Sequence, residues 1–126
     1  MTNSELKIIA NQILREEGQE LINAADRIQD NVVQAFEIIK DHPGKVVICG
    51  MGKSGLVAQK IAATLCSIGT KAVFLHAAEA VHGDLGIYAP GDPTILISKS
   101  GATEELMRLI PILKEFESPL IGIIGN

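Results

Sequence analysis

Apolar residues recur with a helical period over the first third of this chain. From Ser4 to Glu17 they lie three and four positions apart, as on one face of a helix. The same spacing continues from Gln19 to Asp41, and we expect Gly18 to break or bend the helix between the two segments. A His-Pro-Gly turn that finishes at Gly44 ends the pattern. The sequence therefore predicts N-terminal helices over residues 1–44, as part of one domain.

After this turn, short apolar runs alternate with amphipathic segments. Four strands are expected, over residues 45–49, 72–75, 94–97 and 120–124. Two longer helices are expected over 54–68 and 102–116, and 77–86 is expected to form a short helix or a loop. Strands that alternate with helices predict a parallel sheet with right-handed crossovers. We therefore expect an α/β fold, a three-layer αβα sandwich of flavodoxin-like type, over residues 45–126.

Composition excludes several classes of function. The 126 residues are 47% hydrophobic and 21% charged, which is usual for one soluble globular domain. The net charge of −4 and the aromatic content of 3% argue against a nucleic-acid partner. No apolar run is long enough to cross a membrane, and the N-terminus lacks the pattern of a signal peptide. We expect a cytoplasmic protein in which Cys49 and Cys66 are buried free thiols.

Two glycine- and serine-rich segments follow two of the predicted strands. The first is GMGKSG, residues 50–55, and the second is SKSGAT, residues 98–103. In a parallel sheet both would lie at the carboxyl edge, where such folds bind ligands. Hydroxyl groups, backbone N–H groups and helix N-termini all suit a phosphate. The two segments together predict one shared anion site.

The first segment also matches parts of two nucleotide motifs. It satisfies G-x-G-x-x-G, but the acidic residue that would hold a ribose about twenty positions later is missing, because the chain has Phe74-Leu75-His76 there. A Walker A loop would need a glycine five positions before Gly52, where Val47 stands. A tight strand-to-helix turn without a ligand remains the structural alternative.

The second segment has a structural alternative as well. Ser98, Ser100 and Thr103 can direct three hydroxyl groups into one space. Alternatively, Ser100 caps the following helix, and Glu104 or Glu105 completes a capping box.

Titratable residues gather between the two segments, in HAAEAVHGDLG. Glu79, His82 and Asp84 lie within six residues there, which suits proton transfer beside a phosphate. With His76 they are also metal-ligand types, but their spacing matches no established metal motif. A solvated polar loop is the alternative.

These segments, in this order, resemble the sugar isomerase (SIS) domain family, and within it the arabinose-5-phosphate isomerases. The resemblance covers roughly residues 45–126 and rests on GMGKSG, AEAVHGDLG and SKSGATEE. It implies that D-ribulose 5-phosphate and D-arabinose 5-phosphate interconvert through an enediol, without a cofactor or a metal. The family also serves as non-catalytic phosphosugar-binding or regulatory modules, which is the alternative function.

The resemblance further implies roles for individual residues. The catalytic residues would be Lys53, Glu79, His82 and Glu105. The substrate-binding residues would be Gly52, Ser54, Gly55, Ser98, Lys99, Ser100 and Thr103. The family pattern has a neutral amide where this chain has Lys99. Members of the family continue beyond this sequence, often into CBS domains, so we expect a truncated domain, with an inactive fragment as the alternative, and a homo-oligomer (a dimer or a tetramer).

Overall fold

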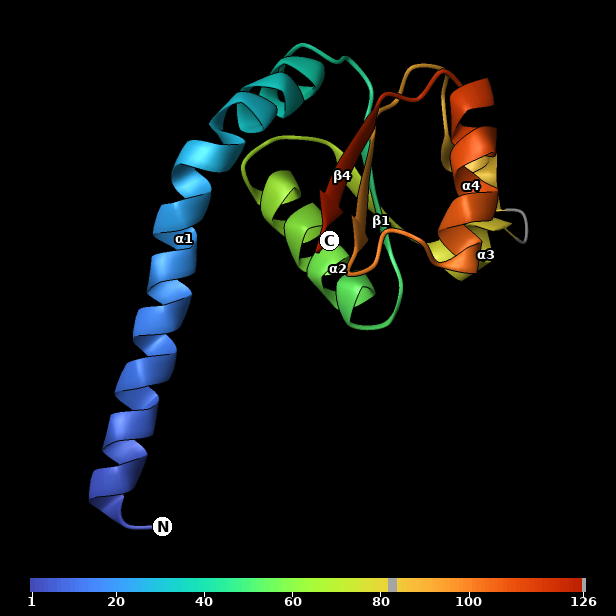
Figure 1. Cartoon of the computed structure of the whole chain (residues 1–126). Coiled ribbons are helices and arrows are strands. Elements are labelled where there is room, and N and C mark those ends of the chain that lie inside the picture. The colour runs from blue at the N-terminus through green and yellow to red at the C-terminus, as the bar shows by residue number, and fades with distance from the viewer. Residues whose placement is uncertain (82–83, 126) are drawn as a thin grey trace. The chain divides into compact units, whose positions relative to one another are not determined.

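The computed structural model describes residues 1–81 and 84–125 (Figure 1). The chain divides into two compact units, Met1–Glu37 and Ile38–Asn126, each of which is described by itself. The elements, in chain order, are α1 (Asn3–Lys40), β1 (Val46–Gly50), α2 (Gly52–Ser67), β2 (Ala72–His76), α3 (Ala77–Val81), the 3-10 helix η1 (Asp84–Ile87), β3 (Thr94–Ser98), α4 (Glu104–Glu115) and β4 (Leu120–Ile124).

The N-terminal segment is one continuous helix, so the expected break at Gly18 is wrong. Glycine costs a helix interior only about 1 kcal/mol relative to alanine. Glutamate and glutamine, which are good helix formers, flank Gly18 on both sides and carry α1 through it. The helix begins with a reciprocal capping box: the Thr2 N–H donates to Glu5 Oε2 at 2.7 Å, and the Glu5 N–H donates to Thr2 Oγ1 at 3.2 Å.

The second unit is built on a parallel sheet of four strands in the order β2-β1-β3-β4. Every residue of β1 and of β3 is buried, as their continuous apolar sequences predict. On one face of the sheet, Val46, Ile48, Ile95 and Ile97 pack against α2. On the other face, residues that include Val47, Cys49 and Leu96 pack against α4 and α3. Helices therefore cover both faces, and the expected three-layer α/β sandwich is confirmed (Figure 1).

The order of the strands creates a crevice between β1 and β3. The chain leaves β1 for α2 on one face and leaves β3 for α4 on the opposite face. Such a switch point, at the carboxyl ends of neighbouring parallel strands, is where open α/β sheets bind ligands. GMGKSG follows β1 and SKSGAT follows β3, so the fold brings the two segments to this point.

A buried carboxylate ties the opposite ends of the same two strands together. Asp92 is 1% exposed, and its oxygens lie 2.7 Å from His42 Nε2 and 2.7 Å from Lys45 Nζ. The Ala89 N–H also donates to Asp92, at 3.0 Å. Burial alone would raise the pKa of Asp92, but the hydrogen bonds from Lys45, Ala89 and His42 together lower it to about 2. The network fixes the starts of β1 and β3.

The two cysteines differ in exposure. Cys49 is buried in β1, and burial raises its pKa to about 12. The expected burial of Cys66 is wrong, because this residue is exposed in the last turn of α2, beyond the residues that the helix buries. No helix among residues 1–81 and 84–125 is both long enough and apolar enough to cross a membrane.

Candidate functional site

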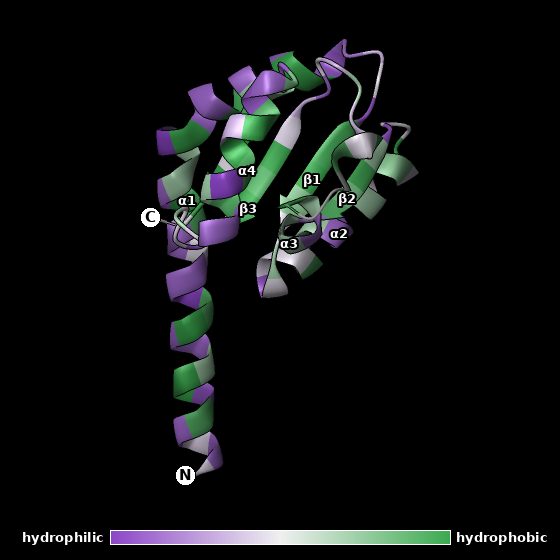
Figure 2. Cartoon of the chain, turned by 90° about the vertical axis from the view of Figure 1, so that its right-hand side faces the viewer, coloured by the Kyte–Doolittle hydropathy of each residue, from purple (hydrophilic) through white to green (hydrophobic). Residues whose placement is uncertain are grey.

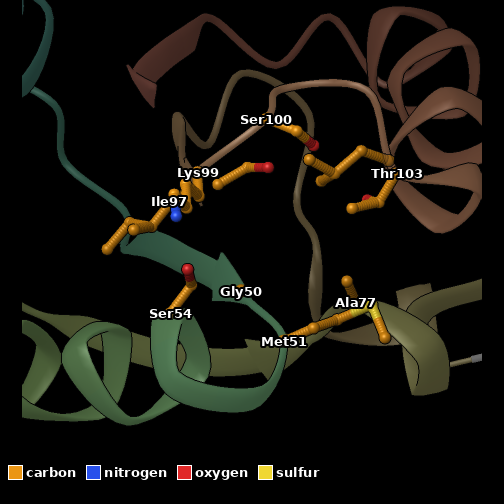
Figure 3. Close-up of a pocket in the computed structure, with 10 residues that line it drawn as sticks. Gly50, Met51, Ser54, Ala77, Ile97, Lys99, Ser100 and Thr103 are labelled. Carbon is orange, nitrogen blue, oxygen red and sulfur yellow. The ribbon is translucent and has the colours of Figure 1, made fainter. Parts of the chain in front are cut away.

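A cavity of about 300 Å³ lies at the switch point between β1 and β3 (Figure 3). One wall comes from the end of β1 and the start of α2, and the facing wall comes from the loop between β3 and α4. The residues that line it are Gly50, Met51, Ser54, Ala77, Ile97, Ser98, Lys99, Ser100, Thr103 and Leu106. Both glycine- and serine-rich segments therefore contribute to one cavity, as the sequence predicts.

The first segment makes a very tight turn from strand into helix. A Cβ atom on Gly50 would lie 2.8 Å from the carbonyl oxygen of Ser54, so only glycine fits there without a backbone shift. A Cβ atom on Gly55 would in turn lie 3.2 Å from the carbonyl oxygen of Gly50, so the two backbones approach each other closely. Gly52 has a φ of 53°, a conformation that glycine adopts readily. This turn brings the N-terminus of α2 and the Ser54 side chain to the cavity.

The second segment is held by hydrogen bonds from its own serines. Ser98 Oγ accepts the Gly101 N–H at 2.9 Å, and Ser100 Oγ accepts the Ala102 N–H at 3.2 Å. The capping alternative for Ser100 is wrong, because the N-cap of α4 is Thr103. Ser98 and Ser100 instead shape the loop and still line the cavity.

Thr103 carries an unpaired hydroxyl group. Its Oγ1 is inaccessible to solvent and has no hydrogen-bond partner within the part of the chain that the structure describes. It makes no capping bond to α4 either, although threonine usually does so at this position. A buried hydroxyl group without a partner costs about 1–3 kcal/mol. Because Thr103 lines the cavity, a ligand there could supply the missing partner.

The surroundings of the cavity favour an anion. Both α2 and α4 begin beside it, and in the described chain the N-cap side chain of neither helix bonds to its first turn. The N-terminus of a helix carries a partial positive charge and free N–H groups. Lys99 is the single charged residue among the described residues that line the cavity. In Figure 3 the Ser54 hydroxyl points toward the loop that carries Lys99, across the cavity.

Among the described residues, only some of the predicted site residues line the cavity. Ser54, Ser98, Lys99, Ser100 and Thr103 line it, whereas Gly52, Lys53, Gly55, Glu79 and Glu105 are not among its lining residues. Lys53 and Glu79 are exposed, and Glu105 is partly buried in the first turn of α4. His82 lies outside the described residues. Across the described residues, no three His, Cys, Asp or Glu side chains are grouped so as to hold a metal ion.

Sequence reasoning missed the apolar part of the lining. Met51, Ala77, Ile97 and Leu106 all contribute to it. Leu106 belongs to the buried stripe of α4 and Ile97 to a buried strand, so their sequence pattern indicates only core positions. Met51 could have been found, because it stands between the two glycines of the first segment.

Comparisons with known proteins agree with this geometry. Residues 37–126 match the SIS domain family. Arabinose 5-phosphate isomerase KpsF of Escherichia coli is 46% identical over 116 residues, which are 91% of this chain and 37% of that protein. Arabinose 5-phosphate isomerase KdsD of Pseudomonas aeruginosa is 47% identical over 100 residues, which are 79% of this chain and 31% of that protein. The chain thus spans about a third of the length of these relatives.

A solved structure supports the same fold. A protein of E. coli CFT073, solved in complex with arabinose 5-phosphate, aligns with a TM-score of 0.89 and 37% sequence identity. The alignment covers all of this chain and 67% of that one. The match to the family model and the sequence identity to these relatives therefore agree with the solved structure on the fold and on the protein family.

Proposed function

This chain belongs to the SIS domain family, and on that premise we propose that it forms the phosphosugar site of an aldose–ketose isomerase. The observation that carries the proposal is the cavity, where an unpaired buried hydroxyl group, a lysine and two uncapped helix N-termini meet among the described residues. These features together suit a phosphate dianion. The phosphate cradle would consist of Ser54, Ser98, Ser100 and Thr103, with Gly52, Gly55 and Lys99 as further substrate-binding residues.

We further propose that the substrate pair is D-arabinose 5-phosphate and D-ribulose 5-phosphate. A base removes the proton from C2 of the aldose and O1 takes up a proton, which gives an enediol. Loss of the proton on O2 and protonation of C1 then give the ketose, so no electrons are gained or lost. The names of the similar proteins support this choice of substrate.

Four residues would make up the catalytic machinery. Lys53 would neutralise negative charge on the phosphate or the enediolate, because cations near a developing oxyanion lower the barrier to its formation. Glu79, His82 and Glu105 are the candidates for the group that moves the proton, because each can act as a general base near neutral pH. The position of Glu105 in the first turn of α4, next to the cavity residues Thr103 and Leu106, supports its candidacy. The protein would work as a cytoplasmic homo-oligomer, without a cofactor.

Turnover tests this proposal. D-Arabinose 5-phosphate is incubated with the protein, and the ketose is measured with time. Lys53→Ala and Glu105→Ala should each lower kcat at least a hundredfold. Lys60→Ala is the matched control, because Lys60 is an exposed lysine of the same helix α2, and it should leave kcat unchanged. Full activity in Lys53→Ala and Glu105→Ala would refute the assigned roles.

A second candidate function is non-catalytic phosphosugar binding. One observation favours it: hydroxyl groups line the cavity, whereas Lys53 and Glu79 do not. The two functions differ in one measurable respect. A binding module would be stabilised against heat by D-arabinose 5-phosphate without converting it.

A further inference from the structure

The cavity between β1 and β3 has an apolar wall as well as a polar one. Met51, Ala77 and Leu106 line it, and each belongs to, or packs against, the hydrophobic core between the sheet and helices α3 and α4. Ala77 is fully buried and Leu106 is 3% exposed, so close packing fixes both side chains. In Figure 2 strands β1 and β3, which end at the cavity, are largely hydrophobic. The apolar wall is therefore a continuation of the core.

Met51 is the adaptable member of this wall. It is partly buried, and in Figure 3 its side chain runs toward Ala77 and away from Lys99. Met51 is also the N-cap of α2, where it makes no side-chain hydrogen bond to the helix. Serine, threonine, aspartate and asparagine are preferred at this position because they bond to the first turn. A residue that gives up this stabilisation beside a cavity indicates a role for its side chain in the site.

The apolar wall would face the reacting end of the sugar, and this step rests on the proposed function. The groups that suit a phosphate, which are the serine and threonine hydroxyls and Lys99, come from the start of α2 and from the loop between β3 and α4. Methionine, alanine and leucine side chains offer a phosphate no hydrogen-bond donor. Helix α3, which contributes Ala77, carries the candidate base Glu79 and none of the residues of the phosphate cradle. With the phosphate at the polar wall, C1 and C2 of the sugar therefore lie toward the apolar wall.

We propose that Met51 limits the length of the sugar phosphate that the cavity accepts, by closing the cavity beyond C1. The cavity has a volume of about 300 Å³, which is at the lower end of the range for small-molecule sites. A sugar with one more carbon would have to place that carbon and its oxygen against the apolar wall. The wall offers no hydrogen-bond donor and only the weakly accepting sulfur of Met51. The added oxygen would lose its bonds to water without replacement, which should weaken binding roughly ten- to a hundredfold.

D-Glucose 6-phosphate is the probe for this limit. It is D-arabinose 5-phosphate extended by one carbon at the aldehyde end, with the same phosphate and the same configuration at the carbons that the two sugars share. Isothermal titration of the wild-type chain with each sugar phosphate gives the ratio of the two dissociation constants without any need for turnover. We expect D-glucose 6-phosphate to bind at least about tenfold more weakly. Equal affinities in the wild-type chain would overturn the proposal.

Shortening the Met51 side chain should relax the limit. Met51→Ala should lower the ratio of the two dissociation constants at least about fivefold, because it removes the wall beyond Cβ. Met107→Ala is the matched control: Met107 is 58% exposed on α4 and is not among the described residues that line the cavity, so the ratio should stay within about twofold of wild type. Met51→Leu keeps an apolar side chain of similar volume and should retain the discrimination. An unchanged ratio in Met51→Ala, or an equal change in Met107→Ala, would overturn the proposal.

A second variant keeps the test valid if Met51→Ala fails to fold. Met51→Ser also shortens the wall, and serine at the N-cap can bond to the first turn of α2, so its Tm should exceed that of Met51→Ala. Met51→Ser should lower the ratio of dissociation constants in the same way, and a wild-type ratio in this variant would overturn the proposal.

The titrations also separate this inference from the proposed function. If the wild-type chain binds D-arabinose 5-phosphate but its discrimination does not depend on Met51, the phosphosugar site stands and the role of Met51 is refuted. Binding of neither sugar phosphate by the wild-type chain would overturn the proposed function, and this inference with it.

Discussion

Replacing Thr103 by valine should have opposite effects on the free and the ligand-bound protein. Thr103 Oγ1 is buried at the cavity and unpaired in the described part of the chain. Valine has nearly the same shape and lacks the hydroxyl group. The free protein would therefore lose an unsatisfied polar atom, whereas a bound phosphate would lose a hydrogen-bond donor.

The size of both effects follows from the burial of this one atom. An unpaired buried hydroxyl group costs about 1–3 kcal/mol, so Thr103→Val should raise the free energy of unfolding of the free protein by about 1 kcal/mol or more. A hydrogen bond to a charged group contributes about 1.5–3 kcal/mol. The dissociation constant for D-arabinose 5-phosphate should therefore rise roughly ten- to a hundredfold.

Two measurements check the predicted gain in stability and the predicted loss of affinity. Urea denaturation without ligand gives the change in stability, and isothermal titration with D-arabinose 5-phosphate gives the change in affinity. Thr64→Val is the control, because the Thr64 hydroxyl is exposed and already donates to the Lys60 carbonyl at 3.0 Å. It should leave the affinity unchanged. A Thr103→Val protein that is less stable when free, or that binds as tightly as wild type, would refute this account of the cavity.

Two further predictions concern the scaffold of the site. Asp92→Asn should lower the free energy of unfolding at pH 6 by about 2 kcal/mol, because the pKa of Asp92 is lowered from 3.8 to about 2 in the folded state. This contribution is present above pH 4 and is lost as the pH falls toward 2. In urea denaturation, the difference in the free energy of unfolding between Asp92→Asn and wild type should therefore be about 1–2 kcal/mol smaller at pH 2.5 than at pH 6. A difference that does not change with pH would contradict this prediction. Gly50→Ala should destabilise by about 1–3 kcal/mol, because its Cβ would lie 2.8 Å from a backbone oxygen of Ser54. Gly86→Ala is the control, because no described atom lies within 4 Å of the added carbon, and it should change thermal stability little. Equal effects of the two glycine variants on stability would count against the tight turn at Gly50.

The fold could be predicted from the sequence wherever one local pattern determined the structure. Continuous apolar runs predicted all four strands of the described sheet, and the glycine- and serine-rich segments lie where strands β1 and β3 end. The break at Gly18 was predicted wrongly, because the helical tendency of its neighbours outweighed the local cost of one glycine.

The rest depends on contacts between residues that are distant in the sequence. Asp92 meets His42 and Lys45, which precede it by 50 and 47 positions, so no local pattern reveals the network. The apolar lining from Met51 and Leu106 arises only when β1 and α4 come together. Likewise, the lack of a hydrogen-bond partner for Thr103 Oγ1 among the described residues can be established only from the positions of all the atoms around it.

The central claim is that the two glycine- and serine-rich segments form one phosphosugar site. Nuclear magnetic resonance tests it most directly, by titration of the isotope-labelled chain with D-arabinose 5-phosphate while the backbone amide signals are followed. The account predicts that the amides of residues 50–55 and 98–103 shift together, with one dissociation constant, and that those of α1 do not. Unchanged amides in either segment, or different dissociation constants for the two, would contradict it.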